Sequence, residues 1–456
     1  MTETTSPSNR NSGRRDLTPD RLGSNYFKLF GASTISNVGD GIALIAYPWL
    51  ASALTRSPLM IALVAVVQRL PWLLFSLPAG VVTDRMDRRR LMVGANIVRT
   101  VLTGLVALLV LNRTNVLPAV DVVTDPDAII TTNLGLYLIV LIATLFIGTA
   151  EVLYDNAAQT FMPSIVHSSQ LEKANGRLWS IEQVANTFIG PPLGALLLVA
   201  AFSLPFFVDA ATFGISAALV ALIPSTSRST SHDTPARKHW RTELSEGFRW
   251  LWNHELLRPL AIILGLLNGI MMMTLSILVL YAQEVLNTSA TEFALLGTGG
   301  ALGGVIGGWT ASRISSRIGA GPSLWLTLLG AATTTAVIGL TSWWMIAWLM
   351  FAIMSMVGVL WNVITVSLRQ TIIPDHLLGR VNSVYRFFGW GMMPIGSLLG
   401  GVIVVAAEVF DSREIALRLP WLIAAGLYVL LLVFAAPKLT TERIEAARSA
   451  ATADDH

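Results

Sequence analysis

The stretch Gly80-Val-Val-Thr-Asp-Arg-Met-Asp-Arg-Arg-Arg90 separates two long apolar runs, 57–82 and 90–111. Each run is long enough to cross a bilayer, because a spanning helix needs roughly 20 mostly apolar residues. The loop between them carries four arginines, and such basic loops lie on the cytoplasmic side of membrane proteins. The stretch therefore predicts a protein that crosses a membrane, with this loop in the cytoplasm.

The composition of the whole chain points the same way. Of its 456 residues, 53% are hydrophobic and 13% are charged, whereas soluble globular proteins carry about 25% charged residues. This excludes a soluble enzyme, and no pattern of nucleophile and base suggests an enzyme of another kind. The chain has no cysteine, which excludes disulfides and thiolate metal sites.

Apolar runs predict an all-α membrane protein with twelve transmembrane helices. The spans are helices because lipid tolerates no unpaired backbone groups and because the runs are too long for barrel strands. They cover approximately 26–54, 57–82, 90–111, 133–158, 177–200, 203–223, 257–282, 292–312, 321–341, 343–367, 383–407 and 419–436.

The distribution of basic residues predicts the orientation. With the N-terminal tail in the cytoplasm, most of the 31 Lys and Arg residues fall in cytoplasmic loops and tails. The outer loops then hold only Arg56, Arg113, Arg413 and Arg418. This asymmetry predicts a multi-pass protein of the cytoplasmic (inner) membrane with both termini in the cytoplasm.

The chain also repeats itself at an interval of about half its length. The stretch 80–90 aligns with 308–318, and 192–197 aligns with 394–399. Such a duplication predicts two pseudo-symmetric six-helix halves with a substrate path at their interface. We expect a tail over 1–25, a first half over 26–223, a linker with an interfacial helix over 224–256, a second half over 257–437 and a tail over 438–456.

The loop at 80–90 resembles the signature loop of the major facilitator superfamily, with Asp87 in place of a glycine that is usual there. Ser36-Asn-Val-Gly-Asp40-Gly and Glu151-Val-Leu-Tyr-Asp-Asn156 are similar to the macrolide-efflux and enterobactin-exporter branch of proton-coupled exporters. The resemblance extends from about Tyr26 to Lys438 and implies a drug:proton antiporter. The signature residues it implies are Gly80, Asp84, Arg85, Asp87, Arg88 and Arg89.

Gly190-Pro-Pro-Leu-Gly194 resembles a motif of antiporters, Gly-Pro-x-x-Gly-Gly, with Ala195 as its last residue. Pro191 and the proline after it remove backbone donors and bend the helix. Gly190 and Gly194 permit the close approach of another helix. An ordinary kinked packing helix would carry the same residues, so the motif alone does not decide between the two.

Asp40, Arg69 and Arg99 fall near the bilayer midplane, where an unpaired charge costs at least ~2.5 kcal/mol. We therefore expect Asp40 to pair with one of the two arginines. Such a pair either couples transport to protons or only joins the helices. Asp209 lies about two turns into its span, close enough to the outer surface to be hydrated, and is either a proton entry point or a packing acid.

Glu151 and Asp155 share a helix face near the cytoplasmic end of their span. Their expected partners are the arginines of the 85–90 loop or Arg177. The resemblance implies a cytoplasmic latch here, in which an acid such as Asp84 meets a helix of the other half. Substrate contact is the alternative. We expect Glu182 to belong to the same network and Arg386 to neutralise Asp84 or Glu182.

The second half offers amide, methionine and tryptophan side chains in place of midplane acids. Flexible methionines and broad aromatic faces suit varied apolar ligands. The alternative is that these side chains only pack against other helices. The expected substrate cavity is formed by Asn37, Gln68, Asn268, Met271, Met272, Trp361, Asn362 and Trp390.

No Walker lysine or Gly-x-Gly-x-x-Gly turn after a strand is present, so we expect no nucleotide and no ATP dependence. Histidine spacing predicts no metal site, the basic residues form no face for nucleic acid, and no cofactor is expected. The sequence thus predicts a monomeric secondary transporter that exports amphipathic or hydrophobic small molecules in exchange for protons. The alternatives are a dedicated exporter of a native metabolite such as a siderophore, and a lysolipid flippase.

Overall fold

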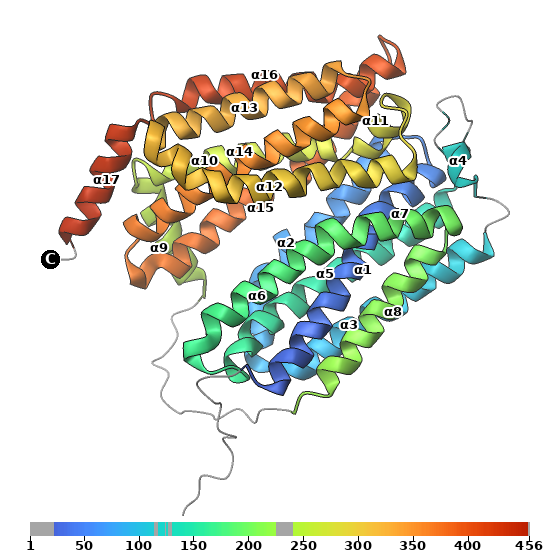
Figure 1. Ribbon diagram of the computed structural model, residues 1–456, viewed down its shortest axis with the longest axis horizontal. Coiled ribbons are helices and arrows are strands. Elements are labelled where there is room, and N and C mark those ends of the chain that lie inside the picture. The colour runs from blue at the N-terminus through green and yellow to red at the C-terminus, as the bar shows by residue number, and fades with distance from the viewer. Residues whose placement is uncertain (1–21, 114–116, 124, 126–129, 225–239, 455–456) are drawn as a thin grey trace, which may run out of the picture.

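The computed structural model describes residues 22–113, 117–123, 125, 130–224 and 240–454. Every regular element in these ranges is a helix, which confirms the predicted all-α class. Figure 1 shows two bundles, one drawn in blue to green and the other in yellow to red. The bundles meet near α4, α7 and α11 and diverge toward α6 and α9.

The first bundle contains α1 to α8 and spans the sequence before the linker. Its α-helices are α1 Ser24–Leu54, α2 Pro58–Arg85, α3 Arg88–Asn112, α4 Val120–Val123, α5 Leu134–Phe161, α6 Leu171–Gln183, α7 Gly190–Ala200 and α8 Leu204–Ala221. Two short 3₁₀ turns, Met162–Ser164 and Ser168–Gln170, and a π-helical segment, η3 Val184–Ile189, complete it.

The second bundle follows the linker, of which 225–239 lie outside the described residues. It contains α9 Trp240–Asn253, α10 Leu257–Leu275, α11 Leu278–Glu284, α12 Ala290–Ile318, α13 Ala320–Leu340, α14 Trp344–Ile372, α15 Asp375–Ala407, α16 Arg413–Ala435 and α17 Thr441–Asp454.

Within the described residues, eleven helical segments are long and apolar enough to cross a membrane. The predicted span at 292–312 is the one that is missing from this set. It forms α12, which is 29 residues long, but repeated glycines between Gly297 and Gly308 lower its mean hydropathy. The chain is a multi-pass membrane protein.

The predicted span at 177–200 begins earlier than expected, at Leu171, and is interrupted. Pro191 and Pro192 have no N–H to donate to the carbonyls of residues 187 and 188. The helix widens into the π-helical η3 directly before them, as single π turns commonly do at functional sites. α6, η3 and α7 therefore form one bent span.

Glycines set the closest helix contacts in both bundles. A Cβ atom added at Gly190 would lie 2.4 Å from the Cα atom of Gly41, so η3 and α7 touch the backbone of α1. In the second bundle, a Cβ atom at Gly303 of α12 would lie 1.8 Å from the carbonyl oxygen of Ala352 on α14. Both contacts require glycine.

α9, the predicted interfacial helix, packs on the start of α15. Arg380 of α15 donates to Glu246 of α9 over 2.8 Å, and Phe248 stacks on Phe388. The turn after α9 ends at His254, whose Nδ1 accepts the backbone N–H groups of residues 256 and 257 over 3.2 Å. His254 therefore caps α10.

Candidate functional site

A cavity of about 640 Å³ lies inside the first bundle and is rich in charge. Among its lining residues are the predicted Asn37 and Gln68 and also Trp72. Five carboxylates and two guanidinium groups line it: Asp40, Glu151, Asp155, Glu182, Asp209, Arg69 and Arg99. We call this space the acidic cavity.

An ion pair joins α1 and α3 at the wall of this cavity. Arg99 donates to the carboxylate of Asp40, and its guanidinium lies 3.7 Å from the ring centroid of Phe213 on α8. The Arg99 side chain is 2% exposed and that of Asp40 is 28% exposed. The expected midplane pair therefore involves Arg99, whereas Arg69 is exposed and makes no hydrogen bond or ion pair with any described residue.

Asp209 differs from the expectation that it is hydrated. It is 2% exposed, and its Oδ1 atom has no hydrogen-bond partner among the described residues. The cause is the close approach of α8 to α1, since a Cβ atom at Gly39 would lie 2.5 Å from that oxygen. A buried carboxylate oxygen without a partner is costly, and this one borders the acidic cavity.

Glu151 and Asp155 line the acidic cavity, and neither makes a hydrogen bond or ion pair with a described residue. The expected pairing with Arg177 or with the described arginines of the 85–90 loop is therefore absent from this structure. Glu182 accepts a hydrogen bond from Ser33 over 3.1 Å. It does not pair with Arg386, contrary to expectation, because Arg386 lies in the other bundle.

The signature loop fastens helix ends within the first bundle. Asp87 caps α3 by accepting the N–H of Arg90 over 2.9 Å. Arg88 donates to the carbonyl of Thr160 over 2.6 Å, and Arg89 donates to the carbonyl of Ala221. Cations at helix C-termini satisfy the last carbonyls and complement the helix dipole. The surroundings of Gly80 and the side chains of Asp84 and Arg85 lie outside what the structure describes.

A second cavity of about 590 Å³ lies inside the second bundle. Five predicted residues line it: Asn268, Met271, Trp361, Asn362 and Trp390. Met272 does not, since the α10 backbone turns it into the protein, where it is 8% exposed. The charged lining residues described are Arg369 and Arg386, so we call this space the basic cavity.

The two cavities adjoin where α2 meets α15. Trp72 lines the acidic cavity and Trp390 lines the basic cavity. Their rings are in edge-to-face contact, with centroids 4.8 Å apart. Sequence reasoning included Trp390 and missed Trp72, because one tryptophan in an apolar run is not distinctive.

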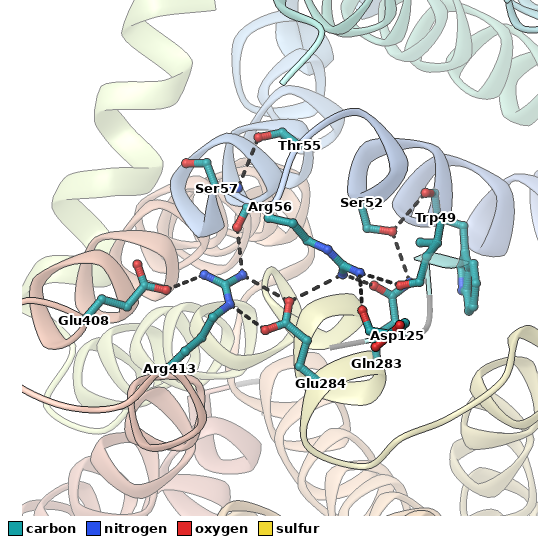
Figure 2. Close-up of polar contacts among 11 residues, drawn as sticks. Trp49, Ser52, Thr55, Arg56, Ser57, Asp125, Gln283, Glu284, Glu408 and Arg413 are labelled. Carbon is teal, nitrogen blue, oxygen red and sulfur yellow. Dashed lines mark hydrogen bonds and ion pairs between the residues drawn. The ribbon is translucent and has the colours of Figure 1, made fainter. Parts of the chain in front are cut away.

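At the end where the bundles meet, an unpredicted charge network joins the two halves (Figure 2). Arg413 of α16 contacts both oxygens of Glu284, at 2.5 and 3.1 Å, and contacts Glu408 at 2.5 Å. Arg56, in the turn between α1 and α2, lies 3.4 Å from Glu284 and 2.9 Å from Gln283. We call Arg56, Glu284, Glu408 and Arg413 the charge clamp.

Further contacts extend the charge clamp across the interface. Gln283 donates to Ser52 of α1 over 3.0 Å, and Arg413 donates to the carbonyl of Arg56 over 2.8 Å. Glu284 is 6% exposed, so it is held almost fully out of solvent. The sequence contained one clue to the charge clamp. Few basic residues were expected in the outer loops, and two of those four, Arg56 and Arg413, belong to the clamp.

Two membrane-spanning helical bundles with adjoining polar cavities define a two-domain transporter fold. The family model described as Major Facilitator Superfamily matches residues 29–397. The chain belongs to this family of membrane transporters.

Two relatives and two solved structures illustrate the likeness. The chain is 25% identical to the multidrug efflux pump Tap of Mycobacterium tuberculosis over 405 residues, covering 88% of this chain and 91% of Tap. It is 27% identical to the enterobactin exporter EntS of Escherichia coli over 277 residues, covering 59% of this chain and 64% of EntS.

Solved structures share the fold. A bacterial homologue of the human lysosomal transporter Spinster, in an inward-facing and occupied conformation, gives a TM-score of 0.69 at 13% identity, over 92% of this chain and 97% of that one. The nucleoside transporter NupG gives 0.65 at 13% identity, over 91% of this chain and 99% of that one.

Proposed function

We propose that the chain is a proton-coupled secondary transporter that exports amphipathic and hydrophobic small molecules by alternating access. The observation that carries the proposal is the ion pair between the buried Arg99 and the partly exposed Asp40 at the wall of the acidic cavity. The similarity to Tap over most of both chains supports multidrug efflux as the activity.

Proton coupling follows from the charges around Arg99. Protonation of Asp40 removes the negative partner of a guanidinium that is almost fully buried, and an uncompensated buried charge is strongly unfavourable. Asp209 lies one helical turn before Phe213 on α8, the residue that stacks on Arg99. Asp209 is therefore available to attract the guanidinium, so that protonation of Asp40 moves α3 relative to α1.

The antiporter-type motif lies directly beside this pair. Gly190 touches the backbone of Gly41, the residue after Asp40. Gly194 touches Ile42, since a Cβ atom there would lie 2.9 Å from the carbonyl oxygen of Ile42. A shift of Asp40 on α1 would be transmitted to η3 and α7 through these contacts.

We place the protein in the cytoplasmic membrane as a monomer, with its termini in the cytoplasm and the charge clamp outside. The basic residues of the cytoplasmic loops support this orientation. The clamp then closes the outer side, and the described conformation is open toward the cytoplasm. The two halves correspond to 26–223 and 257–437, joined by a linker over 224–256 and flanked by cytoplasmic tails.

The proposal is tested with a fluorescent lipophilic cation in cells that lack other efflux pumps. Cells that express the chain should accumulate less dye, and a protonophore should abolish the difference. Asp40→Asn should fold and reach the membrane but lose export. Glu445→Gln, which neutralises an exposed acid on α17, is the matched control and should export normally. Export by Asp40→Asn at the wild-type rate would reject the coupling role of Asp40.

A dedicated siderophore exporter is the second candidate, because of the similarity to EntS. The acidic cavity argues against it for an anionic catechol siderophore. Its carboxylates exceed its guanidinium groups, and like charges in a cavity disfavour an anion. Siderophore export without dye export would favour this second candidate.

A further inference from the structure

We infer that the preferred ligand is a zwitterion with an aromatic body, bound across the two cavities, its cationic group on the acidic side and its anionic group near Arg386. The inference rests on the proposed function, since it names the class of molecule that the transporter carries. It follows from the separation of unlike charges onto the two bundles.

The acidic side has more carboxyl groups than basic groups to pair with them. Arg99 forms an ion pair with Asp40. The other basic residue that lines the cavity is Arg69, and the other acidic lining residues are Glu151, Asp155, Glu182 and Asp209. Glu151 and Asp155 have no partner among the described residues. Asp209 is a second, independent observation that points to a cationic ligand, because it is 2% exposed and one of its oxygens, at the cavity wall, has no partner among the described residues. This side attracts a cation.

The basic side has the opposite charge. Arg369 is occupied, since it donates to the carbonyl of Thr365 over 3.3 Å and lies 4.5 Å from the ring centroid of Tyr385. Arg386 is exposed in the cavity and makes no hydrogen bond or ion pair with a described residue. No carboxylate is among the lining residues described for this cavity. A free guanidinium here is suited to a carboxylate or phosphate.

The seam between the cavities favours an aromatic body. Trp72 and Trp390 come from different bundles and meet edge to face there. Each lines one cavity, so a planar ligand that crosses the seam contacts both rings. Aromatic rings in stacked or edge-to-face contact attract one another beyond the effect of the apolar area they bury. The cationic group, the aromatic body and the anionic group of the proposed ligand thus lie in this order from the first bundle to the second.

A rhodamine with a free carboxylate and its methyl ester form a matched pair of probes. Both share one cationic ring system, and only the free acid is a zwitterion at neutral pH. Their dissociation constants are measured by fluorescence anisotropy on the purified full-length protein in nanodiscs, without a pH gradient. The wild type should bind the free acid roughly tenfold more tightly than the ester, a difference of about 1.4 kcal/mol.

Variants locate the source of this preference. Arg386→Gln should weaken binding of the free acid until both probes bind alike, and Arg386→Lys, which keeps the charge, should retain most of the preference. Arg313→Gln, on an exposed arginine of α12 that lines neither cavity, should bind as the wild type does. Glu151→Gln should weaken both probes several-fold, because both carry the cation.

Three results overturn the inference. They are equal or tighter binding of the ester by the wild type, an unchanged ratio in Arg386→Gln, and no binding of either probe. The proposed function fails separately, because it depends on proton-driven export and this binding needs no gradient. Proton-driven dye export without the preference would reject the zwitterion alone. The preference without proton-driven export would reject only the coupling.

Discussion

Arg413 donates hydrogen bonds to both carboxylate oxygens of Glu284 within the second bundle. The same carboxylate lies 3.4 Å from the guanidinium of Arg56 in the first bundle. One buried acid thus joins two guanidinium groups from opposite halves. In an alternating-access transporter, such a link must break whenever this end opens. We therefore expect the charge clamp to contribute to the free-energy difference between the two end states.

Glu284→Gln should favour opening of the clamped end, because it leaves two guanidinium groups without their shared acid. The chain has no cysteine, so Ser52→Cys introduces a single reporter at a buried position beside the clamp. Labelling by a membrane-impermeant maleimide should rise roughly fivefold or more in the Glu284→Gln background, a population shift of about 1 kcal/mol.

Glu414→Gln is the matched control for this experiment. Glu414 pairs with Arg418 over 2.8 Å within α16, at the same end of the molecule but in a single bundle. Its loss should leave labelling unchanged. Equal labelling of the Glu284→Gln and parent proteins would show that the clamp does not hold the two halves together.

Gly303→Ala should destabilise the second bundle, because the new methyl group would lie 1.8 Å from the carbonyl oxygen of Ala352. Overpacking of this kind costs about 1–3 kcal/mol. Gly300→Ala on the same helix meets nothing within 4 Å and should be neutral or slightly stabilising. Thermal unfolding of the purified proteins compares them, and equal unfolding temperatures would refute the predicted backbone contact.

Gly190→Ala should abolish export and leave most of the protein folded. The added Cβ atom would lie 2.4 Å from the Cα atom of Gly41, so α7 must move away from α1 beside Asp40. Gly176→Ala on α6 meets nothing within 4 Å and serves as the control. Dye export that is normal in both variants would mean that the motif only packs.

His254 should make stability depend on pH. Burial lowers the pKa of this histidine below its ordinary value of 6.5, and a proton on Nδ1 would remove the acceptor that caps α10. The unfolded chain therefore takes up the proton first. Stability from this group is present above the ordinary pKa and is lost as pH falls through the lowered pKa.

His254→Asn keeps a short acceptor for the cap but cannot titrate in this range. Its unfolding temperature should fall less between pH 7 and pH 5 than that of the wild type, and the difference should develop below the ordinary histidine pKa of about 6.5. A parallel decline in the two proteins would assign the pH dependence to other groups.

Much of the fold was predictable because membrane spans leave local signals. Apolar runs, charged loops and the glycines at 190 and 194 are each readable within a few residues of sequence. The choice between Arg69 and Arg99 as the partner of Asp40 was not readable. Each residue turns a helix by about 100°, so an uncertainty of one or two residues in a boundary changes which face a side chain occupies.

Contacts between the halves were the least predictable features. Arg56 and Glu284 are 228 positions apart, and their meeting depends on how two complete bundles pack. The partners expected for Glu151 and Asp155 were wrong for a different reason, since Arg88 and Arg89 of the same bundle bind the carbonyls of Thr160 and Ala221 instead. Their position near the cytoplasmic end of the span was readable from the sequence, but the cavity beside them depends on how the helices of the first bundle pack together.

Uptake of a lipophilic cation into proteoliposomes under an imposed pH gradient tests the central claim most directly. Purified wild-type protein should accumulate the dye against its gradient, and dye addition should release protons down theirs. Asp40→Asn, reconstituted at the same density, should bind the dye but show neither dye accumulation nor proton release. Gradient-driven accumulation by Asp40→Asn at the wild-type rate would contradict the assignment of proton coupling to the Asp40–Arg99 pair.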